Sequence, residues 1–417
     1  MIPVGQFSVS KRGLASSIQS MFSNGEQGAW YDPSDLSTGN MYQLSNQTTP
    51  VTAMEQPVGW IRDKSGRNNH AFQATSANRP TLSARYNGLR STEDLSTSFW
   101  VLVGSATRTS TTLTVTTSTT DGIYNTAGNF LGSVASGVSM TCSVELSGSG
   151  TIRFGVLNGN GSTRSFQVIT LTSTPTRYTN TFVNDATGVN IGIILNSNGV
   201  ATTVTVGKAD FRITNDLYGI IPAYQRVTTA TDYDTVGFPS YLRFNGNSSA
   251  LLTNSIDFSG TDKMNVWAGL RKLSDAARGM LTELSTTVVS SNGSFFVDAP
   301  PVAASPAYRF YGGGTIDAEA ASPSSYPAPI TNVLTGIEDI SAPNLTLRLN
   351  GAQVITSTAT QGTGNFGNFP LYIGARGGSS LWFNGRLYGL VVRGASSNAS
   401  QIERGETYMN VKTGKVY

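Results

Sequence analysis

Short β-type segments recur along this sequence at intervals of about ten residues, and Gly, Asn or Pro separates nearly every pair. Segments 139–146, 166–171 and 190–195 are rich in β-branched and aromatic residues, and the first alternates apolar with polar positions. Strands this short and this numerous bury enough surface only when two sheets pack face to face. The pattern therefore predicts an all-β fold of the sandwich or jelly-roll type.

The sequence from residue 241 onward continues this pattern with longer and more aromatic segments. It contains Asn350-Gly351, the strongest short signal for a hairpin. One helix is predicted near the C-terminus, where Ser400 precedes Glu403 by three residues, as in a capping box. Gly414 is placed to end this helix.

The composition supports an ordered and weakly charged chain. Charged residues make up 13% of the 417 residues, against about 25% in an average protein. Aromatic residues make up 9%, and net charge is only +3, so the chain lacks the signature of disorder. This length corresponds to two or three domains of about 150 residues each.

Several classes of partner are disfavoured by the same composition. The basic residues are scattered rather than clustered, which argues against nucleic acid. No apolar run reaches the roughly 18 residues of a membrane span, and we expect no membrane insertion. The first residues show no signal-peptide pattern. Cys142 is the sole cysteine, so we expect a buried, inert thiol and a fold without disulfides, which suits assembly in a reducing cytoplasm.

Four stretches of the sequence resemble a known fold. Segments 28–36 (GAWYDPSDL), 63–70 (DKSGRNNH), 241–246 (YLRFNG) and 385–392 (GRLYGLVV) are similar to the concanavalin A-like (laminin G-like) lectin/glucanase-fold domain of phage virion structural proteins. Residues 95–226 resemble a carbohydrate-binding-module-like jelly roll, which is also common in phage tail and fibre proteins. Together the two resemblances span nearly all of the chain beyond residue 20.

These resemblances imply a nested domain order. The concanavalin A-like sandwich comprises residues 23–92 and 228–417, and the jelly roll at 93–227 is inserted into it. The insertion is expected at the Asn87-Gly88 turn, because exposed turns tolerate inserted domains. Residues 1–22 are polar and are expected to form an N-terminal anchor or linker.

Carboxylates are the first candidates for catalysis, because retaining glycosidases hold two of them about 5 Å apart. Glu338 and Asp339 are adjacent, so on a strand they point to opposite faces. Asp317 and Glu319 can share a face, but a solvated loop is favoured there. The single histidine, His70, follows a tight turn and is interpreted as structural rather than catalytic. We therefore predict a chain that is not an enzyme.

Metal and sugar ligation leave two sets of candidate residues. With one His and one Cys, zinc is nearly excluded, whereas calcium needs only oxygen ligands, and Asp63, Asn68 and Asn69 are the best set. A hairpin turn held by their hydrogen bonds is the favoured alternative, so no cofactor is expected beyond this calcium. For glycans, aromatic rings near turns or strand ends are the candidates. They are Trp100, Tyr124, Tyr311 and Trp382. Trp30, Trp60 and Trp267 are expected in the core.

The phage resemblance implies a virion structural or adhesion protein: a head fibre, decoration, collar or tail-fibre subunit assembled in the host cytoplasm. Its expected partners are other virion proteins and host-surface polysaccharide, and a homo-oligomer, with a trimer favoured, is what such appendages form. Two alternatives stay open. One is a purely architectural capsid cement protein, and the other is a polysaccharide-degrading tailspike.

Overall fold

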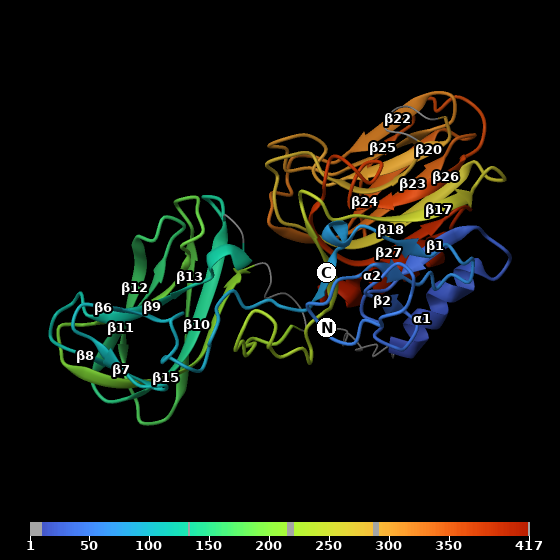
Figure 1. Cartoon of the computed structure of the whole chain (residues 1–417). Coiled ribbons are helices and arrows are strands. Elements are labelled where there is room, and N and C mark those ends of the chain that lie inside the picture. The colour runs from blue at the N-terminus through green and yellow to red at the C-terminus, as the bar shows by residue number, and fades with distance from the viewer. Residues whose placement is uncertain (1–10, 132–133, 215–220, 287–291, 416–417) are drawn as a thin grey trace, which may run out of the picture. The chain divides into compact units, whose positions relative to one another are not determined.

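The computed structural model describes residues 11–131, 134–214, 221–286 and 292–415, which divide into two compact units (Figure 1). Unit 1 comprises Met1–Ser83 and Pro239–Tyr417, and unit 2 comprises Ala84–Phe238, so unit 2 interrupts the chain of unit 1. Each unit is built from two sheets of antiparallel strands. The prediction of an all-β fold with a short C-terminal helix is confirmed.

Unit 1 is a sandwich of two large sheets. Among the described residues, the first sheet has eight strands, seven of them in the order β25 (Ala352–Ser357), β24 (Asn344–Leu349), β23 (Ile330–Asp339), β18 (Lys263–Lys272), β27 (Asn384–Arg393), β16 (Tyr241–Asn245) and β5 (Thr81–Ser83), while β1 (Gly28–Tyr31) also pairs with β27. The second has nine, in the order β2 (Met41–Tyr42), β3 (Trp60–Ile61), β4 (Ala71–Phe72), β17 (Leu251–Asp257), β26 (Asn368–Ile373), β19 (Met280–Leu284), β20 (Ser294–Asp298), β21 (Arg309–Gly313) and β22 (Asp317–Ala321).

The core of unit 1 lies between these two sheets. Alternate residues of each strand point to opposite faces of a sheet, so one apolar set per strand faces inward. On β20 the inward set is Phe295 and Val297, and on β22 it is Ala318 and Ala320. The intervening residues of the nine-stranded sheet therefore point away from the core.

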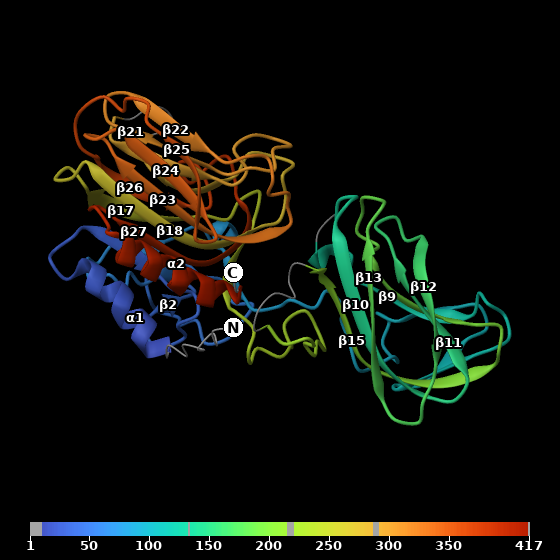
Figure 2. The ribbon, with the colours of Figure 1, turned by 180° about the vertical axis from the view of Figure 1, so that it is seen from behind.

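The outer face of the eight-stranded sheet is covered by helices (Figure 2). The helix α1 (Lys11–Gln19) continues into the 3-10 helix η1 (Ser20–Phe22), and α2 (Ala399–Thr413) lies beside α1. A second apolar cluster fills the space beneath them and includes Ile18, Phe22, Trp30, Trp267 and Met409.

The expectation of a linker over residues 1–22 is wrong for its described part. Residues 11–22 are helical, and Ile18, Met21 and Phe22 are each at most 2% exposed, because they complete the apolar cluster on the sheet. Residues 1–10 lie outside the described residues. Trp30 and Trp267 are buried as predicted, although in this cluster under the helices rather than between the sheets.

The start of α2 differs from the prediction by two residues. Asn398 is the N-cap, and its side chain accepts a hydrogen bond from the backbone N–H of Gln401, whose side chain accepts one from the backbone N–H of Asn398. This is a capping box built by Asn and Gln rather than by Ser400 and Glu403. Gly414 ends the helix in the left-handed conformation (φ 69°), as predicted.

Unit 2 is a smaller sandwich. Among the described residues, each of its sheets has five strands. One has the order β13 (Thr176–Val183), β10 (Ser139–Gly148), β15 (Thr202–Ile213), β8 (Thr112–Val115) and β7 (Thr107–Arg108), and the other β12 (Thr163–Thr170), β11 (Thr151–Leu157), β14 (Gly192–Ser197), β9 (Gly122–Thr126) and β6 (Val101–Val103). The remaining short helices are η2 (Ser76–Asn78) in unit 1 and η3 (Gly128–Phe130) in unit 2. Cys142 on β10 is buried, and burial raises the pKa of its thiol.

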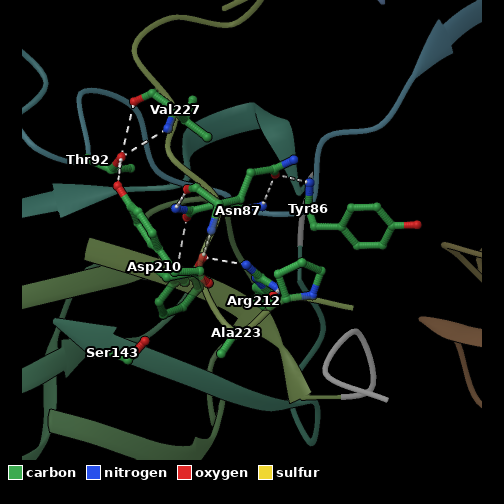
Figure 3. A network of polar contacts seen from close by, with 12 residues as sticks. Tyr86, Asn87, Thr92, Ser143, Asp210, Arg212, Ala223 and Val227 are labelled. Atoms are coloured by element: carbon green, nitrogen blue, oxygen red, sulfur yellow. Dashed lines mark hydrogen bonds and ion pairs between the residues drawn. The ribbon is translucent and has the colours of Figure 1, made fainter. Parts of the chain in front are cut away.

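A network of buried polar side chains ties together the first and last segments of unit 2 (Figure 3). Asn87 is fully buried, and its amide donates to the carbonyls of Ala209 and Gln225, both at 2.9 Å. Its side-chain oxygen accepts from the N–H groups of Leu89 at 3.1 Å and Phe211 at 3.0 Å. The Asn87 side chain thus connects its own segment both to β15 and to the segment that contains Gln225.

The same network contains an ion pair and a second link between the segments. The Asp210 carboxylate pairs with Arg212 at 2.6 Å and accepts from the N–H of Gln225 at 3.0 Å. Thr92 and Val227 exchange backbone and side-chain bonds at 3.0 Å. Unit 2 begins at Ala84 and ends at Phe238, rather than at 93 and 227 as expected, and these contacts show that residues 87–92 pack with it. Asn87-Gly88 is also not the exposed turn that was predicted, since both residues are buried.

None of the helices within the described ranges is long and apolar enough to cross a membrane.

Candidate functional site

One row of side chains crosses all nine strands of the second sheet of unit 1 on its outer face. Strand register places the members directly opposite one another from strand to strand. In order from β2 to β22 they are Tyr42, Trp60, Phe72, Leu252, Tyr372, Glu283, Phe296, Tyr311 and Glu319. We call these nine residues the aromatic row.

The orientation of the aromatic row follows from the residues that flank it. Met41, Ile61, Ala71, Leu251 and Leu371 all belong to the core between the sheets, and each is the immediate neighbour of a row member. Since adjacent strand residues point to opposite faces, the row members point outward. The helices α1 and α2 pack on the outer face of the eight-stranded sheet and not on this face.

The rings of the aromatic row contact one another in two places. Tyr42 and Trp60 meet edge to face with centroids 5.5 Å apart, and Phe296 stacks on Tyr311 at 4.3 Å with an interplanar angle of 12°. Trp60 and Phe296 are buried, at 6% and 8% exposure, whereas Tyr42, Phe72, Leu252, Tyr372 and Tyr311 are half-buried. Half-buried rings keep a face or edge available to a ligand.

A pair of arginines and a carboxylate adjoin Phe296. Asp298, two residues along β20, is fully buried and accepts hydrogen bonds from Arg278 at 3.1 Å through both of its oxygens. Arg309 donates to the same carboxylate from Nε at 2.9 Å and Nη2 at 2.6 Å. Burial raises the pKa of Asp298, and the two guanidiniums oppose that rise.

Glu283, a member of the aromatic row, is a second buried acid beside Phe296. Its carboxylate accepts from the N–H of Gly377 at 3.1 Å and lies 3.4 Å from Nε of Arg376. Arg376 and Gly377 belong to a tight turn closed between Arg376 and Ser380. Burial raises the pKa of Glu283, and the Arg376 guanidinium opposes that rise.

Asp317 and Glu319, the carboxylates considered for catalysis, lie on β22, where Glu319 is the last member of the aromatic row. Asp317 and Glu319 share the outer face, as the sequence suggested, because Ala318 and Ala320 point into the core. Glu319 is exposed and pairs with Arg309 at 2.9 Å. Burial raises the pKa of the Tyr311 hydroxyl, and a hydrogen bond to Asp317 raises it further. The region is a strand, not the solvated loop that was favoured.

The other predicted carboxylate pair has no common surface. Glu338 and Asp339 point to opposite faces of β23, as expected for neighbours on a strand. Glu338 is 1% exposed, whereas Asp339 is half-buried and pairs with Lys263 at 2.9 Å. They cannot act together on one substrate.

The four predicted sugar-binding rings fall in different places. Tyr311 belongs to the aromatic row. Trp382 is half-buried and pairs with Met280 at the start of β19, beside the row but outside it. Tyr124 is half-buried on β9 of unit 2, opposite Ile194 and Val101.

Trp100 does not suit the role that was predicted for it. It is 1% exposed, belongs to the apolar core of unit 2, and its indole N–H donates to the carbonyl of Ser91 at 2.8 Å. A position near a turn suggests exposure, but this ring packs into the core. A sugar has no access to it.

The predicted calcium ligands form a hydrogen-bonded turn. The buried Asp63 carboxylate accepts four bonds of 2.8–2.9 Å, from the N–H groups of Trp30, Ser65 and Asn69 and from the Ser65 hydroxyl. Asn68 is exposed in the left-handed conformation (φ 62°). All lone pairs of Asp63 face donors, which favours the turn over calcium. Within the described ranges, no three His, Cys, Asp or Glu side chains are grouped to hold a metal.

His70 is held in the same hairpin. Its Nδ1 accepts from the N–H of Asp63 at 3.0 Å, and its ring lies 4.7 Å from that of Trp60. Burial lowers the pKa of His70, and the nearby Asp63 opposes this. Trp60 is buried as predicted, but beneath His70 on the outer face rather than in the core.

Sequence reasoning missed most of the aromatic row. Tyr42, Phe72 and Tyr372 lie on short strands far apart in the chain, and their alignment depends on register between β2, β4 and β26. The one local signal is that each ring follows an apolar residue in a β segment. That signal indicates a two-faced strand but does not reveal which strands are neighbours.

Comparisons with known proteins find similar chains among the solved structures. A scan against protein-family models finds no match, and a search of curated proteins also finds none. Among solved structures, the chain is similar to the CBM40 of the Ruminococcus gnavus IT-sialidase bound to alpha2,3 sialyllactose, with 14% identity over 36% of this chain and 83% of that chain and a TM-score of 0.29. The chain is also similar to the K499G mutant of the NanB sialidase of Streptococcus pneumoniae. The identity is 16% over 39% of this chain and 26% of that chain, with a TM-score of 0.30.

A third similar structure is the binding domain of Paraclostridial Mosquitocidal Protein 1, with 13% identity over 40% of this chain and 43% of that chain and a TM-score of 0.30. The chain thus spans less than half of the length of the last two structures. All three likenesses concern part of the chain and leave its ligand open. The fold and the site together define a two-unit β-sandwich protein with an aromatic row on one sheet face of unit 1.

Proposed function

We propose that this chain is a glycan-binding adhesion protein and that unit 1 binds the glycan along the aromatic row. The observation that carries the proposal is the register of six aromatic residues across nine consecutive strands, on the sheet face opposite the core. Side chains on an ordinary solvent face are mostly polar, so six rings aligned on one such face support a ligand-binding surface.

The chemistry of the aromatic row suits sugars. A pyranose ring has an apolar face of C–H groups that stacks on an aromatic ring, and its hydroxyls hydrogen-bond to neighbouring polar groups. Tyr42, Tyr311 and Tyr372 supply both a ring and a hydroxyl, and the exposed Glu319 supplies an acceptor within the row. Nine strands spaced about 4.8 Å apart extend over roughly 40 Å, which is room for several sugar residues in a chain.

We further propose that the protein acts in a bacteriophage virion, as a head fibre, decoration, collar or tail-fibre subunit. Support comes from segments 28–36, 63–70, 241–246 and 385–392, which resemble phage concanavalin A-like domains. These segments contribute β1, the Asp63 turn, β16 and β27 of unit 1. The aromatic row favours a ligand-binding role over an architectural one.

Binding of the purified protein to an array of neutral, uronate-bearing, sialylated and sulfated oligosaccharides tests the proposal. We expect a defined subset of glycans to bind and the Tyr311→Ala/Tyr372→Ala double variant to lose them. Tyr178→Ala is the matched control, because Tyr178 is also a half-buried strand tyrosine but lies on β13 of unit 2 and is not a candidate sugar-binding ring. An array without binding would favour the architectural alternative, and release of reducing sugar would favour the tailspike.

A further inference from the structure

Three guanidinium groups surround Phe296 in the aromatic row. The central carbon of each lies 5.0–5.5 Å from the centre of the ring, and they belong to Arg278, Arg309 and Arg376. Arg278 precedes β19, Arg309 begins β21, and Arg376 follows β26, so three separate parts of the chain bring positive charge to one ring. We call these three residues the arginine cluster.

The carboxylates that pair with the arginine cluster lie mostly beneath it. Asp298 and Glu283 have side-chain exposures of 0% and 3%, whereas Arg278, Arg309 and Arg376 are 24%, 17% and 12% exposed. A ligand that approaches Phe296 therefore meets guanidinium groups before it meets these two acids.

Donor groups of the cluster remain for a ligand. A guanidinium has five N–H donors. Arg278 uses Nε and Nη2 on Asp298, and among the described residues no hydrogen bond from its Nη1 or from the Nη atoms of Arg376 is found. Arg309 is more fully used, on Asp298 and Glu319. The exposed acids Asp317 and Glu319 stand on the β22 side, so the donors of Arg278 and Arg376 define the site.

We propose that the arginine cluster recognises an acidic glycan, one that carries carboxylate or sulfate groups, and positions an anionic group over Arg278 and Arg376 while a sugar ring stacks along the row. This inference rests on the proposed glycan binding and deepens it to a ligand class. Arginine suits the task because its planar fork donates two parallel hydrogen bonds to a carboxylate or sulfate.

The test compares acidic and neutral members of the same oligosaccharide array at two salt concentrations. The acidic glycans should form the bound set, and their affinity should fall about tenfold or more between 0.05 and 0.5 M NaCl, because salt screens exposed charges. The Arg278→Gln and Arg376→Gln variants should each lose affinity for acidic glycans by about tenfold, and the salt dependence should weaken. In Arg278→Gln, Arg309 still holds Asp298, so the fold is retained.

Arg243→Gln is the matched control. Arg243 is also an arginine of unit 1 paired with a carboxylate, that of the half-buried Glu55 at 3.1 Å, but it lies on β16 of the other sheet. It should leave binding unchanged. Binding of neutral glycans alone, or binding that is insensitive to salt and to Arg278 and Arg376, would overturn the acidic-glycan inference while leaving glycan binding intact. Failure to bind any glycan would overturn both.

Discussion

The carboxyl group of Glu338 packs directly against Gly312 between the two sheets of unit 1. A methyl group at position 312 would come within 2.3 Å of Oε2 and 2.4 Å of Oε1 of Glu338. Both carboxyl oxygens are buried without a hydrogen-bond partner among the described residues. Glycine at 312 thus makes room for an acid in the core, next to Tyr311 of the aromatic row.

Replacing Glu338 with Gln should stabilise the protein at neutral pH. Burial, and to a lesser degree Asp317, raises the pKa of Glu338 well above its usual value. At pH values above the ordinary pKa of a glutamate, the Glu338 carboxyl is ionised in the unfolded chain but still protonated in the folded chain. Stability therefore falls by about 1.4 kcal/mol for each pH unit over which this difference persists. Glu338→Gln should raise the Tm at pH 7 and have little effect at pH 4. An equal shift at both pH values would contradict this.

Gly312→Ala should destabilise unit 1 by about 1–3 kcal/mol, because the added carbon overlaps the Glu338 carboxyl in a closely packed core. Gly260→Ala is the control, since an added Cβ there meets nothing within 4 Å. Denaturant unfolding measures both. A Gly312→Ala variant as stable as Gly260→Ala would show that the two sheets are less tightly packed at Glu338 than described.

Asn87→Ala should loosen the ends of unit 2. The variant removes four hydrogen bonds and leaves buried backbone groups of Ala209 and Phe211 without their partner, at a cost of about 1–3 kcal/mol for each group that stays unsatisfied. Hydrogen exchange should accelerate in β15 and in residues 85–92. Asn160→Ala, an exposed asparagine of the same unit, should change neither. Unaltered exchange in Asn87→Ala would show that the network does not hold the ends of unit 2 together.

Calcium should have no effect on the Asp63 turn. Because all four acceptor positions of Asp63 are filled by N–H and O–H groups, chelation with EDTA should leave the Tm unchanged, while Asp63→Ala should lower it by several degrees. A Tm that rises on addition of calcium and falls with EDTA would restore the metal site.

The sequence allowed the fold class to be predicted because strand and turn signals are local. Asn350-Gly351 joins β24 to β25, and Gly414 ends α2, since the conformation of each depends only on its neighbours. The cap at Asn398 was misplaced because Ser400 and Glu403 offer the same spacing two residues later. Local signals do not choose between overlapping candidates.

The site was much harder to predict, because it depends on strand register. Tyr311 was found as one ring near a strand end, but its partners Phe296 and Tyr372 come from other parts of the chain. Trp100 was selected by the same criterion and is buried, since a position near a turn does not determine exposure. The arginine cluster was missed for the same reason, as Arg278, Arg309 and Arg376 come together only around Phe296.

Glycan binding along the aromatic row is tested most directly by titration calorimetry. The measurement is the affinity of the Tyr311→Ala/Tyr372→Ala variant for a glycan that the native protein binds. Each lost ring contact is worth about 0.5–1.5 kcal/mol, so the double variant should bind the glycan about 5- to 150-fold more weakly than the native protein. Its circular dichroism should be unchanged, and Tyr178→Ala should bind as the native protein does. Native affinity in the double variant, or an equal loss in Tyr178→Ala, would contradict glycan binding along the aromatic row.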